Sequence, residues 1–352
     1  MYPPQPSQPT SYPVHCILPP YVLEQLAKAT DAKIREQAIK ALAQSAQIRA
    51  VRGTLAALPT MAAVPSPAGK KHRLLYDARH KPAAYLPGKL VRSEGDPPVK
   101  DKAVNEAYNY SGFTYDFYLQ VLGRNSLDGK GMSLISSVHV GIAFNNAFWN
   151  GEQMAYGDGD ENIFTRFTKS LDVCGHELTH GVVSHTSNLE YRDEPGALNE
   201  SFADVFGSLV KQWKKGQTVT QADWLIGPEI MGPGVQAKSL RTLTEAKAYQ
   251  DDPLLGTDPQ PKHLRDKYKG TDDYGGVHIN SGIPNHAFYL TATALGGRAW
   301  TKAGPIWYKT LLALTQASDF GDAAATSVRI AATEYGKTEE KAVGDAWKAV
   351  GL

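Results

Sequence analysis

Two histidines four residues apart stand in the stretch DVCGHELTHGVVSH, residues 172–185. Residues i and i+4 lie on one face of a helix, about 6 Å apart along its axis. His176 and His180 can therefore bind one zinc ion, whose bonds to imidazole nitrogens are about 2.0–2.1 Å long. Glu177 is well placed to act as a general base beside such an ion. His185 rotates off this face and is not expected to be a ligand.

A catalytic zinc ion needs a third protein ligand and an open fourth position. The stretch GALNESFADVFGSLV supplies Glu200 on a second predicted helix, which is largely apolar. Asp204 lies one turn further on and could accept the N–H of a ligand histidine, as carboxylates around zinc sites do. The alternative is that both acids are solvated helix charges. Their burial without a cation or partner would cost several kcal/mol, so the metal interpretation is favoured.

The elements that must position these residues form three parts of the chain. Residues 1–60 are predicted to be separable from the rest, with a proline-rich start and two helices, the second capped by Asp31. Residues 61–185 are strand-rich, include a helix with an aromatic face over 101–123, and end in the helix that carries the histidines. Residues 186–352 are predominantly helical in pattern. These patterns predict an α+β fold.

The composition of the chain excludes several other classes of protein. The formal net charge over 352 residues is +1, so neither nucleic acid nor a membrane is an expected partner. No apolar run reaches about 18 residues, the length of a membrane span. The N-terminus has no basic start and no apolar core, so we expect no standard signal peptide, and either cytoplasmic retention or export by a non-classical route. We expect a monomer.

The chain has two cysteines, Cys16 and Cys174, too few for a disulfide framework. Cys16 has two interpretations. It could ligate zinc in a precursor as a removable inhibitor, or it could be a small buried hydrophobic residue. The second interpretation is favoured.

Beyond these residues, the sequence resembles a known family. The resemblance is to the thermolysin family of zinc metallopeptidases, and it begins with GHELTH and GALNESFAD at this separation. Three further stretches match in the same order, so that the resemblance covers about residues 100–352: NNAFWNGEQMAYGDGD, SLRTL and GGVHINSGIPNHAFYL. CILPPYVLEQLA resembles the short propeptide of protealysin-like members, which implies that residues 1–60 are a propeptide and linker. The resemblance implies a thermolysin-like fold: a β-rich N-terminal domain, a mainly helical C-terminal domain, and a zinc cleft between them.

The resemblance also implies what the chain does. The expected activity is zinc-dependent endopeptidase hydrolysis on the amino side of bulky apolar residues of peptide or protein substrates. The expected form is a zymogen, in which the propeptide is an intramolecular inhibitor, removed by a cut between about Arg49 and Lys71. The expected cofactor is one catalytic zinc ion.

Individual roles follow residue by residue from the matching motifs. The zinc ligands would be His176, His180 and Glu200, with Glu177 as general base and with support from Asp204 and Asn199. Tyr191 and His278 would donate hydrogen bonds to the oxyanion, and Asp273 would orient His278. The substrate backbone would be bound by Asn146, Ala147 and Arg241. An apolar pocket would be lined by Phe164, Val173 and Leu240.

Calcium is the point at which the chain departs from the family pattern. The family's double calcium site is built from acids, and Asp172 and Asp223 remain here. Lys211, Leu225 and Pro228 stand where other acids would be. Calcium takes six to eight oxygen ligands, so two acids facing a lysine are a poor cage. We expect this site to be degraded.

Two other interpretations remain open at this point. One is a non-catalytic binding protein stabilised by zinc, and the other is a peptidase domain silenced by its propeptide. A structural zinc ion has a closed coordination shell and needs no general base, so Glu177 favours a peptidase over the first. The sequence does not separate an active peptidase from a silenced one.

Overall fold

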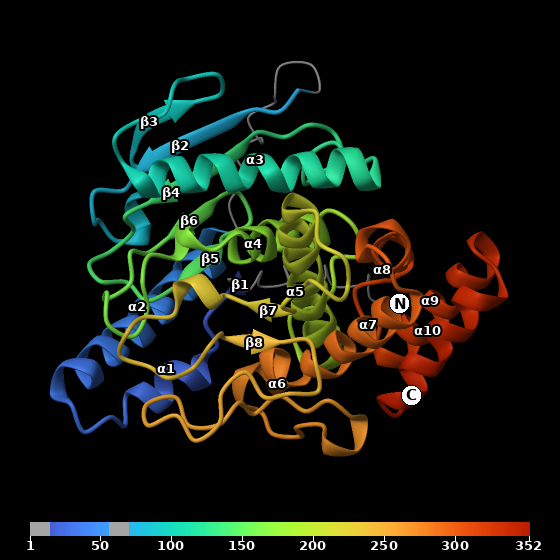
Figure 1. Cartoon of the computed structure of the whole chain (residues 1–352). Helices are drawn as coiled ribbons and strands as arrows, with labels where there is room; N and C mark the ends of the chain where they lie inside the picture. Colours follow the sequence, from blue (N-terminus) through green and yellow to red (C-terminus); the bar gives the residue numbers. More distant parts are fainter. Residues whose placement is uncertain (1–14, 56–69) are drawn as a thin grey trace, which may run out of the picture.

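The computed structural model describes residues 15–55 and 70–352. Within them, a six-stranded mixed sheet has the order β1–β5–β6–β4–β2–β3 (Figure 1). The strands are β1 (His15–Cys16), β2 (Arg73–Asp77), β3 (Lys89–Ser93), β4 (Leu134–Val138), β5 (Ala147–Trp149) and β6 (Met154–Tyr156). Strands β2, β4 and β6 run parallel, and the other pairs are antiparallel.

The helix predicted over 101–123 is α3 (Lys102–Leu122). Asp101 caps it by accepting the Ala103 N–H at 2.8 Å, and Gly123 ends it in the left-handed conformation at φ 68°. The helix lies across the sheet and contacts β2 and β4 (Figure 1). On its aromatic face, Phe117 and Tyr118 are buried against Trp213 and Phe206 of a neighbouring helix. Helix α3 therefore covers the β-rich half, and the predicted element is confirmed.

Two helices cross at the centre of the molecule, α4 (Leu171–Ser184) and α5 (Asp193–Lys215) (Figure 1). Glycines stand where their backbones meet. A Cβ added to Gly207 would lie 2.5 Å from the Asp172 carbonyl oxygen and 3.0 Å from the His176 nitrogen. Only a residue without a side chain permits this approach, which brings the acids of α5 against the histidines of α4.

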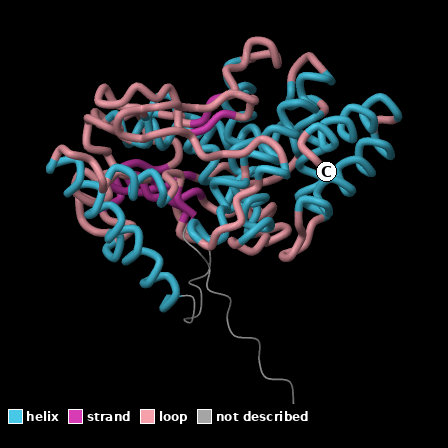
Figure 2. Tube along the Cα trace, turned by 90° about the horizontal axis from the view of Figure 1, so that it is seen from below, coloured by secondary structure: helices cyan, strands magenta, loops and turns pink. Residues whose placement is uncertain are grey.

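The C-terminal half is mainly helical. Its helices are α6 (Asp272–Asn280), α7 (Gly282–Leu295), α8 (Ala303–Ala313), α9 (Phe320–Glu334) and α10 (Lys337–Ala349), beside a small hairpin of β7 (Leu225–Ile226) and β8 (Arg241–Thr242). Short 3₁₀ turns are η2 (Ala83–Tyr85), η3 (Phe167–Lys169), η4 (Pro228–Ile230), η5 (Leu264–Asp266) and η6 (Ala299–Thr301). Figure 2 shows the larger sheet on one side and the C-terminus among helices on the other. The α+β fold is as predicted.

The N-terminal segment (residues 15–55) lies against this body. It comprises β1, α1 (Pro20–Leu26) and α2 (Ala32–Leu55), and Asp31 caps α2 by accepting the Lys33 N–H at 2.8 Å. Apolar residues of α1, Leu23 and Leu26 among them, belong to the same buried cluster as residues of both halves of the body. The small helix pair thus shares the core of the larger unit instead of forming its own.

The predicted domain limits remain predictions. The limit at 185–186 falls in the loop between α4 and α5. The linker predicted before residue 60 lies largely outside the described residues. Within the described ranges, no helix has both the length and the apolarity needed to cross a bilayer.

Candidate active site

Three ligand-type side chains converge where α4 crosses α5. The Nε2 atoms of His176 and His180 are 3.0 Å apart. Each lies 3.5 Å from one carboxylate oxygen of Glu200. All three side chains are fully buried. The two histidines predicted from their i, i+4 spacing and the glutamate predicted on the next helix thus lie close together.

The opposite nitrogens of the two imidazoles are held by other side chains. The Nδ1 of His176 is 2.8 Å from Asp204 Oδ1, and the Nδ1 of His180 is 2.8 Å from Asn199 Oδ1. Both partners act as acceptors, so each Nδ1 carries the proton and each Nε2 presents a lone pair. Arg241 donates two hydrogen bonds to Asp204 at 2.8 and 2.9 Å. Burial alone would raise the pKa of Asp204, but Arg241 and His176 outweigh it and hold the pKa well below its usual range.

The residues fit a zinc ion. Two lone pairs and a carboxylate oxygen face a common point, and Glu200 Oε2 is buried without a hydrogen-bond partner among the described residues. Such an oxygen is costly unless a cation satisfies it. Two histidines and one glutamate are a ligand set of catalytic zinc sites.

Glu177 lies beside this point. Its Oε2 accepts the backbone N–H of Trp149 at 2.9 Å, and its Oε1 has no hydrogen-bond partner among the described residues. Burial raises the pKa of Glu177 well above its usual range, and the nearby Glu200 charge raises it further. A carboxylate with a raised pKa is suited to take up and return a proton.

A hydrogen-bonding pair, Tyr191 and His278, lies next to Glu200. Tyr191 Oη donates to Glu200 and lies 3.2 Å from His278 Nε2. The Nδ1 of His278 is 2.6 Å from Asp273 Oδ1, and Asp273 is in the left-handed region at φ 53°. Burial alone would lower the pKa of His278, but Asp273 and Glu200 outweigh it and raise the pKa to about 9. His278 is therefore held as a donor.

Comparisons with known proteins match this geometry. Residues 68–184 match the model of the thermolysin metallopeptidase catalytic domain, and residues 187–352 match that of the thermolysin metallopeptidase alpha-helical domain. The chain belongs to the thermolysin family.

Three relatives show how far the family likeness extends. The chain is 50% identical to an extracellular metalloprotease of Pectobacterium carotovorum subsp. carotovorum over 288 residues, 81% of this chain and 82% of that one. It is 46% identical to protease PrtS of Photorhabdus sp. (strain Az29) over 343 residues, 96% of this chain and 91% of that one. The solved structure of the precursor of protealysin from Serratia proteamaculans superposes with a TM-score of 0.87 at 46% identity, covering 96% of this chain and 99% of that one.

This thermolysin-family chain is thus a zinc metalloendopeptidase made with a propeptide, and the non-catalytic interpretation is not favoured. The family usually binds calcium as well as zinc.

The N-terminal segment of the thermolysin-family chain runs through the site. Strand β1 pairs antiparallel with β5, and the chain continues along the same edge. Ile17 N–H donates to the Ala147 carbonyl at 3.2 Å, and Leu18 N–H donates to Asn146 Oδ1 at 3.1 Å. Arg241 Nη1 donates to the Ile17 carbonyl at 2.8 Å. Each residue predicted to bind a substrate backbone therefore contacts this segment.

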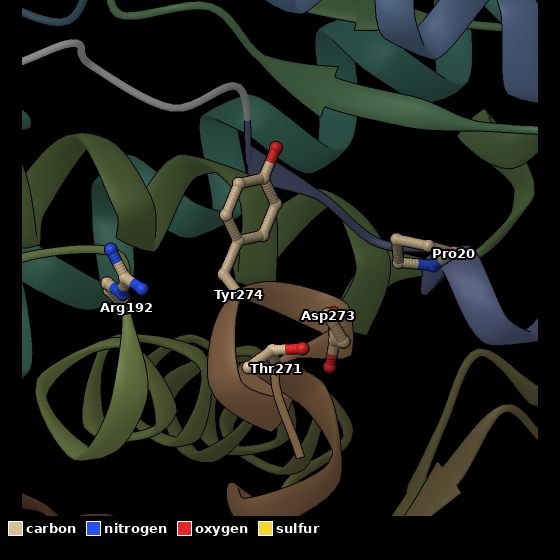
Figure 3. A pocket seen from close by; sticks show the side chains of 5 residues that line it. All are labelled: Pro20, Arg192, Thr271, Asp273 and Tyr274. Atoms are coloured by element: carbon tan, nitrogen blue, oxygen red, sulfur yellow. The ribbon is translucent and has the colours of Figure 1, made fainter.

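The predicted apolar pocket residues Phe164, Val173 and Leu240 are buried, as is Ile17, and all four belong to one apolar cluster. A small pocket remains beside the segment, lined by Pro20, Arg192, Thr271, Asp273 and Tyr274 (Figure 3). Pro20 belongs to the N-terminal segment, whereas Arg192 and the other three residues come from the starts of α5 and α6. The pocket therefore lies where the segment meets the helical half.

Lys211 contacts the two acids that the family resemblance associates with calcium, Asp172 and Asp223. Its Nζ lies 2.7 Å from Asp172 Oδ2, 2.8 Å from Asp223 Oδ1 and 2.7 Å from the Leu225 carbonyl. Burial alone would lower the pKa of Lys211, but Asp172 and Asp223 outweigh it and raise the pKa above its usual range. The buried ammonium thus has three oxygen acceptors, two of them from carboxylates.

One residue at the site, His15, is not among those predicted from the sequence. Its ring stacks on that of His180 with centroids 4.2 Å apart, and it meets Tyr191 edge-on at 4.4 Å. The alternation of side chains between the two faces of a strand is the sequence signal that could have identified His15. If CILPP lies in the cleft, then Cys16 and His15 must face opposite sides. The side chain of Cys16 packs in a small apolar cluster with Val140 and Phe144, as the favoured interpretation predicted.

Proposed function

We propose that this zymogen is held inactive by its own N-terminal segment, which lies in the cleft as a substrate would, and that cleavage after about residue 49 releases an endopeptidase. The observation that carries the proposal is the set of backbone hydrogen bonds from residues 16–18. They involve the residues assigned to substrate binding and catalysis, and the segment runs antiparallel to β5.

The assigned residues divide the chemistry of peptide hydrolysis among them. Zinc, when held by His176, His180 and Glu200, supplies the Lewis acidity that polarises the carbonyl and makes water more acidic. Glu177 takes the proton from the attacking water and returns it to the leaving nitrogen. Its Oε2 accepts the N–H of Trp149 on β5, the strand that pairs with the segment next to the Cys16–Ile17 bond, and this position supports the second transfer.

The negative charge that develops on the carbonyl oxygen needs donors. His278 Nε2 lies 3.0 Å from the Cys16 carbonyl oxygen, and Tyr191 Oη lies within reach of the same imidazole. Asp273 accepts a hydrogen bond from the Nδ1–H of His278 and, with Glu200, raises the His278 pKa to about 9. Near neutral pH the ring therefore carries a proton on both nitrogens, and Nε2 can donate as well. Residues that donate to this carbonyl in the zymogen would donate more strongly to an oxyanion.

The residue after the central bond should set specificity. Ile17 is that residue in the segment, and it is fully buried with the apolar pocket residues. A charged side chain would be left unpaired there. Cleavage before Leu, Phe, Ile or Val is therefore the proposed preference.

Calcium and localisation are part of the same proposal. Because the Lys211 ammonium already binds both Asp172 and Asp223, we propose that no calcium ion binds at that cluster. We further propose that the enzyme is a monomer, and that it stays in the cytoplasm or leaves by a non-classical route. The Pectobacterium relative is named an extracellular protease, which favours release. Activity measured in separated culture medium and cell extract tests this point.

The main experiment uses Glu177→Ala in the full chain. We expect zinc to stay bound at one ion per chain, turnover to fall by about 10²–10⁴-fold, and the uncut precursor to accumulate. Added unmodified enzyme should trim that precursor between about Arg49 and Lys71, as N-terminal sequencing would report. Glu190→Ala, at an exposed glutamate, is the matched control and should process normally.

Two results would contradict the proposal. One is an uncut precursor that already hydrolyses peptides at the full rate. The other is peptide hydrolysis by the trimmed enzyme that a chelator leaves unchanged. Loss of zinc after changing both His176 and His180 to alanine completes the metal test.

A further inference from the structure

The N-terminal segment places one of its own peptide bonds at the centre of the site. The carbonyl oxygen of Cys16 faces His278 Nε2 at 3.0 Å, and the N–H of Ile17 donates to Ala147 at 3.2 Å. The Glu177 carboxylate lies along the same strand pair, because its Oε2 accepts the N–H of Trp149 at 2.9 Å and Trp149 pairs with His15. The Cys16–Ile17 bond thus has an oxyanion donor on one side and the general base on the other.

A bond held in this way is positioned for hydrolysis. Cutting it would join the oxygen of water to the Cys16 carbonyl carbon, break the C–N bond and move a proton to the Ile17 nitrogen. The products would be residues 1–16 with a new carboxylate and a chain beginning at Ile17 with a new amine. An inhibitor with this register lasts only if something keeps the nucleophile away from the bond.

His15 is in position to do so. It is 4% exposed, its ring stacks on that of His180, and it meets the ring of Tyr191 edge-on. A ring nitrogen of His15, a ring nitrogen of His180 and a carboxylate oxygen of Glu200 lie within 4.8 Å of one another, so that one ion could join them. Zinc in catalytic sites keeps a fourth position open, whereas zinc with four protein ligands is closed.

We infer that His15 is the fourth zinc ligand of the zymogen and that it protects the Cys16–Ile17 bond from self-cleavage. The inference rests on the proposed function and adds to it a cause for the stability of the inhibitor. Removal of the segment removes the ligand, so that one cut opens both the substrate groove and the metal.

The coordination is tested with cobalt in place of zinc, in a Glu177→Gln background that keeps the chain uncut. Cobalt(II) reports its ligand number through its visible absorption. We expect His15→Ala to change the band positions and intensity, and added imidazole to restore the parent spectrum. His15→Phe keeps a ring against His180 but lacks the nitrogen, so it should also lose the parent spectrum. The control is His185→Ala, at an exposed histidine just past the end of α4, the helix that carries His180. This substitution should leave the parent spectrum unchanged.

The protection is tested in chains that retain Glu177. Intact mass spectrometry after zinc addition should find a product beginning at Ile17 in His15→Ala, and should find none in His185→Ala or the parent. The outcomes are distinguishable. Failure of every chain to bind cobalt would overturn the proposed function itself. Stoichiometric cobalt with the same spectrum in the parent and His15→Ala, or no cut before Ile17 in a folded His15→Ala chain, would overturn only the role of His15.

Discussion

Replacing Lys211 by methionine should destabilise the fold by about 3 kcal/mol, although no catalytic role is predicted for this residue. The lysine side chain is 1% exposed and Asp172 is fully buried, so the substitution leaves a carboxylate in the interior without its cation. Breaking a buried ion pair by removing one partner costs about 3–5 kcal/mol. The lower end applies because Asp172 keeps hydrogen bonds from Ser170 Oγ at 2.6 Å and Gly227 N at 3.2 Å.

The assay is urea unfolding in a Glu177→Gln background, which prevents self-digestion. Lys215→Met is the matched control on the same helix. Its side chain is 47% exposed and lies 3.7 Å from Glu229, so its loss should change the free energy of unfolding by less than about 1 kcal/mol. A loss below about 1 kcal/mol for Lys211→Met would refute the reasoning that this ion pair is a buried structural contact.

The same cluster allows a calcium test. Lys211→Glu brings a third carboxylate to Asp172 and Asp223, an oxygen set that suits calcium. This variant should be at least as unstable as Lys211→Met, and calcium at about 100 times its Kd should return about 2.7 kcal/mol. The unmodified chain should gain nothing from calcium at this cluster. Equal calcium stabilisation of both chains would show that the ammonium does not take the place of the ion.

Three further predictions concern turnover, specificity and pH. His278→Ala should lower kcat by about 10²–10³-fold with little change in KM, because its contact strengthens as charge develops on the substrate oxygen; a raised KM at normal kcat in steady-state assays would contradict this. A peptide library should show a graded preference for apolar residues after the cut, about 1–3 kcal/mol per methylene, and a profile dominated by acidic residues would argue against Ile17 as the substrate mimic. His139, whose pKa is raised to about 9 chiefly by its hydrogen bond to Asp158, should stabilise the fold by about 1–2 kcal/mol below pH 6.5, and this contribution should be lost as the pH rises through about 9. Urea unfolding of the parent and His139→Gln at pH 6 and pH 10 measures this, and an equal difference at both pH values would rule it out.

The sequence predicts the local parts of the site better than the distant ones. His176 and His180 are set by helical spacing alone, which the chain fixes within one turn. The approach of Glu200 depends on the close crossing at Gly175 and Gly207, for which the sequence has no periodic signal. The roles of Tyr191 and His278 came from family resemblance, because their contact joins residues far apart in the chain.

His15 shows the limit most clearly. Its neighbour Cys16 was considered as a zinc ligand, because thiolates are common zinc ligands. Which of the two side chains faces the site depends on the strand face that each takes. That face is set by pairing with β5, more than a hundred residues away. A one-residue difference in register exchanges the two side chains.

The edge of β5 has a consequence for the proteins this enzyme can cut. Recognition through backbone hydrogen bonds at a strand edge accepts only an extended chain, as His15 and Cys16 are when paired with Trp149 and Phe148. A helix, or a strand already paired in its own sheet, has no backbone groups to offer. The rate at which a folded protein is cut should then follow the free energy of local unfolding at the target, falling tenfold for each 1.4 kcal/mol or so. The ease of local unfolding in the substrate protein, as much as its sequence, would determine which peptide bonds this peptidase cleaves.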